Sequence, residues 1–193
     1  MKKPDIISAL ESVIEAFNKL GITYYIGGSV ASSAYGIARA TMDVDVVAKL
    51  EIRHVSALVK ALESEYYADS EMITDAIHRC SSFNLIHLET MIKVDVFIME
   101  DQPYFREALS RRREDILDED SSRKFYLSSP EDIILSKLAW YGKGGGISEQ
   151  QWQDVLGVLK VQRDLLDTEY LQNWASKLNL SDLLARALED VEN

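Results

Sequence analysis

Apolar and polar residues alternate with two different periods along this chain of 193 residues. Apolar residues spaced three or four positions apart predict amphipathic helices, and a period of two, or a short β-rich run, predicts strands. The helical segments are 4–20, 29–38, 51–67, 70–80, 102–115, 129–142, 148–162, 167–178 and 181–191; the strand segments are 22–26, 43–50, 82–89, 92–99 and 123–128.

The order of these segments predicts the fold class. The predicted strand segments all lie in the first two thirds of the chain and only helical segments follow, which is the pattern of an α+β protein. Segments 82–89 and 92–99 are close enough to form a hairpin, so we expect a short mixed β-sheet flanked by helices. We expect a core over residues 1–128 and a C-terminal helical segment over 129–193, packed together as one compact unit.

Composition limits the classes of function. Hydrophobic residues make up 47% and charged residues 27% of the chain, which is typical of a globular protein. No apolar run approaches the ~20 residues that span a bilayer, so no membrane association is expected. The net charge of −11 disfavours broad binding to nucleic acid backbones. The single cysteine, Cys80, excludes an intrachain disulfide and favours the cytoplasm, and we expect it to be buried.

Three aspartates indicate a metal site. In a strand over 43–50, Asp43 and Asp45 point to the same face with Cα atoms about 7 Å apart. Asp95 alternates in the same way with apolar neighbours in segment 92–99. Carboxylates this close favour a shared Mg²⁺ or Mn²⁺ ion, and two such ions support phosphoryl transfer. The alternative is that all three acids simply face solvent on a half-exposed sheet.

Gly27 and Gly28 follow a predicted strand and precede a predicted short helix. Glycine lets the backbone approach a phosphate closely, and Ser29 adds a hydroxyl and a backbone N–H at the start of the helix. A simple turn explains two glycines equally well. Their position upstream of Asp43 favours phosphate binding.

The segments "GGSVASSAYGIARATMDVDVV", "KVDVFI" and "SSPEDIILSKLAWY" together resemble the polymerase-β-type nucleotidyltransferase superfamily. Within it, the chain is most similar to the small bacterial AbiEii-like branch, over roughly residues 20–160. The resemblance implies a nucleotidyltransferase-like core, with Gly27, Gly28 and Ser29 at the nucleotide phosphates. It also implies that Asp43, Asp45 and Asp95 form the metal and catalytic centre.

Five further positions follow from the same resemblance. Lys137 matches the lysine that lies near the triphosphate in this branch, although a solvated helix lysine is the alternative. Arg39 matches an arginine that contacts phosphate or forms a local ion pair. Gln150 and Gln151 replace the Lys-Asp pair that the branch often has, whereas Asp154 keeps the final acid of that motif. Asp154 either orients Lys137 or the acceptor, or is a surface acid.

The resulting hypothesis is a cytoplasmic, Mg²⁺- or Mn²⁺-dependent nucleotidyltransferase. It would move a nucleoside monophosphate from an NTP to a hydroxyl of an RNA end, a protein or a small molecule. The branch that the chain resembles includes some toxins of toxin–antitoxin pairs, so a toxin role with an antitoxin partner is one candidate. The alternative from a different class is a non-catalytic module that binds nucleotide or a partner, which the two glutamines support.

Overall fold

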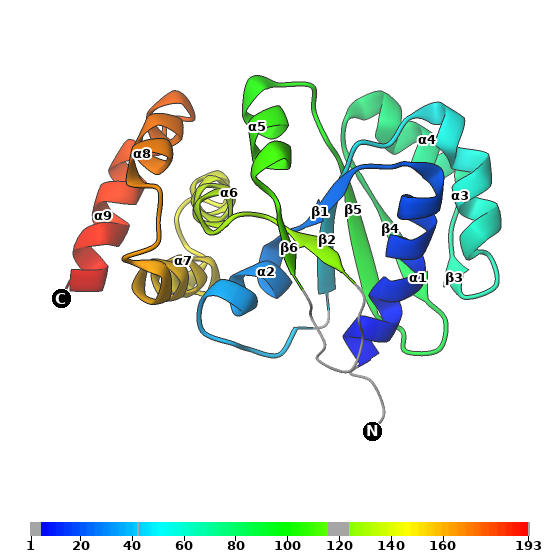
Figure 1. Ribbon diagram of the computed structural model, residues 1–193, viewed down its shortest axis with the longest axis horizontal. Coiled ribbons are helices and arrows are strands. Elements are labelled where there is room, and N and C mark those ends of the chain that lie inside the picture. Colours follow the sequence, from blue (N-terminus) through cyan, green and yellow to red (C-terminus); the bar gives the residue numbers. More distant parts are fainter. Residues whose placement is uncertain (1–4, 42, 116–123, 193) are drawn as a thin grey trace. The chain divides into compact units, whose positions relative to one another are not determined.

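The computed structural model describes residues 5–41, 43–115 and 124–192 (Figure 1). The chain forms two compact units, each assembled from separate stretches of sequence. The first contains residues 1–27 and 41–127, and the second contains residues 28–40 and 128–193. Among the described residues, no helix is both long and apolar enough to cross a bilayer.

The first unit contains a mixed sheet. Within the described residues it has seven strands in the order β3-β4-β5-β2-β1-β7-β6. The strands are β1 (Tyr24–Ile26), β2 (Asp43–Ala48), β3 (Tyr66–Tyr67), β4 (Ser82–His87), β5 (Lys93–Ile98), β6 (Arg113–Asp115) and β7 (Phe125–Leu127). The pairs β2–β5 and β1–β7 are parallel, and the other pairs are antiparallel. The expected β4–β5 hairpin and mixed sheet are confirmed.

Alternation along β2 and β5 separates an apolar face from a polar one. Val44, Val46, Val94 and Val96 are fully buried on one face of these two strands. The residues that alternate with these valines are half-buried or exposed, among them Asp43 and Asp45 in β2 and Lys93 and Asp95 in β5. The predicted period of two is therefore confirmed, and the acids lie on the opposite face from the core valines.

Helices of this unit are α1 (Asp5–Leu20), α3 (Val55–Leu62), α4 (Ser70–Arg79) and α5 (Pro103–Arg111), with a 3₁₀ turn η1 (Ile52–His54). Helix α1 packs on α3 and β5 through its apolar stripe, and α1 and α3 lie side by side in Figure 1. The expectation that Cys80 is buried is wrong: it is exposed at the C-cap of α4 with φ +46°.

Helices form the second unit: α2 (Gly28–Tyr35), α6 (Pro130–Lys143), α7 (Glu149–Gln162), α8 (Thr168–Lys177) and α9 (Ser181–Glu192). Helix α2 packs on α6 and α7, although it comes from the first third of the chain. Ser129 caps α6 by accepting a hydrogen bond from the Asp132 N–H at 3.1 Å. The first turn of α6 is held to α8 by the Tyr170 hydroxyl, which donates to the Asp132 carboxylate at 2.7 Å.

Two short strands, β3 and β6, lie at the ends of segments 51–67 and 102–115, so the prediction of helix is wrong there. β3 has two residues and β6 has three, both too short to establish a period of two. The expected strand 123–128 is shorter in the structure, as β7 (Phe125–Leu127), and residue 123 lies outside the described residues. Residue 4, the expected start of the first helix, also lies outside them.

Candidate functional site

The three predicted aspartates share one face of the β2–β5 pair in the first unit. Asp45 lies directly opposite Asp95 in the parallel register, and Asp43 lies opposite Lys93. The backbone of Asp45 is also fixed to the start of the glycine segment, because its carbonyl accepts a hydrogen bond from the Gly27 N–H at 2.8 Å. We call these four side chains, Asp43, Asp45, Asp95 and Lys93, the acidic face.

Lys93 is the member of the acidic face that sequence reasoning missed. Its ammonium lies 2.8 Å from Asp95 Oδ2 and 3.8 Å from Asp43 Oδ1. The hydrogen bond to Asp95 raises the pKa of Lys93, and the charges of the neighbouring aspartates add to this effect. The signal for Lys93 was its position two residues before Asp95, which in a strand places both side chains on one face.

The acidic face fits a divalent cation in the chemistry of its donors. Its three carboxylates offer the hard oxygen ligands that Mg²⁺ and Mn²⁺ prefer. The Lys93 ammonium already lies among these oxygens as a cation. Across the described residues, no set of three or more His, Cys, Asp or Glu side chains converges on a common metal position. An ion bound at Asp95 Oδ2 would have to displace the Lys93 ammonium from that oxygen.

The glycine-serine segment begins α2 in the second unit. Gly28 has φ +52°, a left-handed conformation that glycine adopts without the clash that a Cβ would cause. Ser29 follows in the first turn, and its hydroxyl accepts a hydrogen bond from Arg39 Nη2. Because the first N–H groups of a helix have no intrahelical acceptor, this turn presents donors that suit an anion.

Asp154 on α7 binds both basic residues of the predicted site, Arg39 and Lys137. Its carboxylate accepts two hydrogen bonds from Arg39, at 3.0 and 3.1 Å, and one from Lys137 Nζ at 2.7 Å. Lys137 and Asp154 are buried, with side-chain exposures of 4% and 7%. Neither residue is therefore a solvated surface group. We call Ser29, Arg39, Lys137 and Asp154 the Asp154 cluster.

Burial alone would raise the pKa of Asp154, because it disfavours the charged carboxylate. The hydrogen bonds from Arg39 and then Lys137 outweigh burial and hold the pKa of Asp154 below its ordinary value. The hydrogen bond with Asp154 correspondingly raises the pKa of Arg39. Asp154 is therefore ionised at neutral pH, and its carboxylate is shared by Arg39 and Lys137.

Gln150 joins the same cluster. With its amide oxygen facing Arg39, Gln150 accepts hydrogen bonds from both terminal nitrogens of the guanidinium, at 2.7 and 2.8 Å. Gln151 lies beside it in the first turn of α7, where its N–H donates to the Ser148 hydroxyl. Gln150 thus binds Arg39 through a neutral acceptor.

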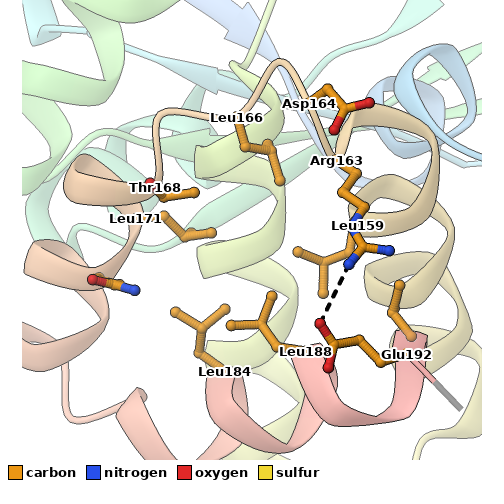
Figure 2. A pocket seen from close by; sticks show the side chains of 11 residues that line it. Leu159, Arg163, Asp164, Leu166, Thr168, Leu171, Leu184, Leu188 and Glu192 are labelled. Atoms are coloured by element: carbon orange, nitrogen blue, oxygen red, sulfur yellow. Dashed lines mark hydrogen bonds and ion pairs between the residues drawn. The ribbon is translucent and has the colours of Figure 1, made fainter.

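A separate pocket lies among α7, α8 and α9 of the second unit (Figure 2). It has a volume of about 300 Å³ and a mostly aliphatic lining that includes Leu159, Leu171 and Leu184. An ion pair between Arg163 and Glu192, 3.3 Å apart, lies beside it. The pocket contains none of the residues that the sequence predicted for phosphate or metal binding.

Comparison with known proteins identifies the fold. No protein family profile matches the chain, and no curated protein is significantly similar to it. ANT(2'')-Ia in complex with adenylyl-2''-tobramycin superposes with a TM-score of 0.60 at 14% identity, over 91% of this chain and 98% of that one. The solution structure of antibiotic-resistance factor ANT(2'')-Ia gives a TM-score of 0.56 at 16% identity, over 97% and 95%.

An antigenic nucleotidyltransferase-like protein from Paracoccidioides brasiliensis gives a TM-score of 0.57 at 20% identity, over 96% of this chain and 93% of that one. This chain has the nucleotidyltransferase fold. The expected α+β class is therefore confirmed, with a nucleotidyltransferase-like mixed sheet and C-terminal helices. At these identities the likeness concerns the fold, and the chemistry has to be argued from the residues.

Proposed function

We propose that this chain is a Mg²⁺- or Mn²⁺-dependent nucleotidyltransferase that moves a nucleoside monophosphate from an NTP to a hydroxyl acceptor. The observation that carries the proposal is the register of β2 and β5, which places Asp45 opposite Asp95 on the face that also holds Asp43. A nucleotidyltransferase fold with three acids on one sheet face supports this chemistry better than a general binding role.

In this proposal, Asp43, Asp45 and Asp95 hold the metal ions, which neutralise phosphate charge when bound. Asp95 also accepts the proton of the attacking hydroxyl. The acceptor oxygen forms a bond to the α-phosphorus while the bond from this phosphorus to the bridging oxygen breaks. The electron pair of that bond leaves with pyrophosphate.

Gly27, Gly28, Ser29, Arg39 and Lys137 bind the triphosphate in this proposal. The backbone N–H groups at the start of α2 donate to phosphate oxygens, and the two cations neutralise charge on the departing pyrophosphate. Asp154 holds the side chains of Arg39 and Lys137 in place before the nucleotide arrives, because it accepts their hydrogen bonds at 2.7–3.1 Å.

The acceptor and the biological setting form the finer part of the proposal. ANT(2'')-Ia is described with adenylyl-2''-tobramycin, an adenylylated antibiotic. A small-molecule hydroxyl is therefore a candidate acceptor here, alongside an RNA end and a protein side chain. We also propose membership of the AbiEii-like branch, a cytoplasmic location and an antitoxin partner, on the basis of the sequence resemblance.

Isothermal titration with Mg²⁺ and each of ATP, GTP, CTP and UTP tests the site. We expect at least one NTP to bind, and the double variant Asp43→Ala, Asp45→Ala to lose that binding. Asp75→Ala, Asp101→Ala is the matched control, because these acids are exposed and pair with surface arginines. Absence of NTP binding in the natural protein, or equal binding by the Asp43 and Asp45 double variant, would contradict the proposal.

The second candidate is a non-catalytic module that binds nucleotide or a partner protein. Two observations favour it: Lys93 lies on the acids, and Gln150 binds Arg39 where the family often has a basic residue. Incubation with α-labelled NTPs and cell extract separates the two candidates. Label transfer that disappears in Asp45→Ala would eliminate the module, whereas nucleotide binding without any transfer would favour it.

A further inference from the structure

Lys93 lies within the acidic face, where the proposed function requires a divalent cation. Its ammonium is 2.8 Å from Asp95 and 3.8 Å from Asp43. The strand register fixes this arrangement, because Lys93 lies opposite Asp43 and two residues before Asp95 on the same face. The pairing of β2 with β5 therefore brings the Lys93 side chain close to Asp43 and Asp95.

Electrostatics gives this lysine a definite role. Three carboxylates on one face repel one another unless a cation lies between them. The single positive charge of Lys93 reduces that repulsion in the absence of metal. The Lys93 side chain is 40% exposed, so it can move from Asp95 into solvent along its flexible stem. Asp95 itself is only 17% exposed, and its Oδ2 already contacts the ammonium at 2.8 Å.

We propose that Lys93 is an internal cation that competes with the divalent ion for Asp95 and Asp43, and that it leaves the acidic face when metal binds. This inference rests on the proposed function, because it assumes that these carboxylates bind metal. Lys93 is a positioning residue in this scheme: it holds the carboxylates in their metal-free arrangement and sets the affinity for the ion.

Titration with Mn²⁺, followed by the electron paramagnetic resonance signal of the free ion, tests the competition. We expect Lys93→Gln to bind Mn²⁺ about tenfold more tightly than the natural protein, because a like charge has been removed within a few ångströms of the ion. Lys93→Arg keeps the charge and is expected to restore the natural affinity. Lys124→Gln is the matched control, because Lys124 pairs with Glu114 at 2.7 Å elsewhere in the same unit.

Thermal unfolding gives a second readout. In EDTA we expect the Tm of Lys93→Gln to fall by about 3 °C, since Asp95 then loses its ion pair with Lys93. Saturating Mn²⁺ should raise the Tm of this variant more than that of the natural protein. A residue that only supports the strand would lower the Tm without increasing the response to Mn²⁺.

A third measurement uses the natural protein alone, so it does not depend on the folding of a variant. Reductive methylation followed by mass spectrometry reports how accessible each amino group is. We expect Mn²⁺ to raise the labelling rate of Lys93 several-fold and to leave Lys124 unchanged. An unchanged rate at Lys93 under saturating Mn²⁺ would overturn the inference.

The outcomes separate this inference from the function on which it rests. If Lys93→Gln binds Mn²⁺ no more tightly than the natural protein, while Asp45→Asn abolishes binding, the competition is wrong and the metal site stands. If neither the natural protein nor Lys93→Gln binds Mn²⁺, both the proposed metal site and the competition are wrong.

Discussion

Asp154 shows how one buried carboxylate can organise two cations. Its side chain is 7% exposed and accepts hydrogen bonds from Arg39 and Lys137. Burial of the Lys137 and Asp154 charges is costly, and the cost is offset only when each group has its partners in good geometry. Removal of the central charge would leave two cations without their common acceptor. The Asp154 cluster is therefore expected to be sensitive to substitution at Asp154.

We predict that Asp154→Asn lowers the free energy of unfolding by about 3 kcal/mol, because it leaves the buried Lys137 ammonium uncompensated. Denaturant unfolding with global analysis measures this change. Asp190→Asn is the control: Asp190 accepts from the neutral Trp152 indole at 3.0 Å, and an amide oxygen can replace it. A loss no larger than in the control would show that the Asp154 charge does not stabilise the unit.

The pH dependence of stability follows from the same residue. The pKa of Asp154 is lower in the folded protein than its ordinary value of 3.8, so the unfolded chain binds a proton more readily. The stabilisation by Asp154 is complete above the ordinary value and is lost as pH falls through the lowered one. The difference in unfolding free energy between the natural protein and Asp154→Asn should thus be constant near neutrality and shrink in acid. A constant difference down to full acid denaturation would contradict the assignment.

The residues of the candidate site could be predicted from the sequence more readily than the side chains that contact them. The period of two placed Asp43 and Asp45 on one face, because alternation is a local property of the strand. The contact of Lys93 with Asp43 depends on the parallel pairing of β2 with β5, which no local pattern specifies. The Arg39–Asp154 pair joins residues 115 positions apart, so its geometry was accessible only from the folded chain.

At the scale of elements, α2 and α7 approach so closely that glycine is required where they meet. A Cβ on Gly36 would lie 2.9 Å from the Val158 backbone nitrogen and 3.0 Å from the Gly157 carbonyl carbon. Both are backbone atoms, which cannot rotate away as a side chain can. The contact also positions the chain that leads from α2 to Arg39.

We predict that Gly36→Ala lowers the free energy of unfolding by about 1–3 kcal/mol, because α2 and α7 must separate to admit the methyl group. Gly142→Ala in α6 is the matched control, since its nearest neighbour is the flexible Leu183 side chain at 3.4 Å. Gly142 lies in the last turn of α6 and meets only a side chain that can move, so the control should be close to neutral. Urea unfolding compares them, and equal stabilities would show that the two helices have room to adjust.

Long amphipathic elements were predictable, and short edge elements were not. Helix α1 buries Leu10, Val13 and Phe17 along the stripe that its spacing predicted. Strands β3 and β6 contain too few residues to display a period, and they form because a neighbouring strand offers hydrogen-bonding partners. Their existence is a property of the sheet, so local sequence carries little information about them.

The whole molecule combines stretches that are far apart along the chain. Residues 28–40 belong to the same compact unit as residues 128–193, where α2 packs on α6 and α7. Ala31, Ser32 and Tyr35 are the buried residues of α2. An eight-residue helix is too short to persist in water without such packing. The sheet strands of the other unit all come from residues 24–127.

A chain that ends at Leu127 should consequently lose the order of residues 28–40. We predict that trypsin cleaves this shortened chain after Arg39 at least about tenfold faster than the full chain, because local unfolding then exposes the bond at little cost. Lys60 in α3 is the internal control, since its helix packs on α1 within the first unit. Timed digestion with mass spectrometry gives both rates. Equal cleavage rates after Arg39 in the two chains would mean that α2 holds its structure without α6 and α7. Equal acceleration of cleavage at Arg39 and at Lys60 would instead mean that the sheet unit depends on residues 128–193 for its own stability.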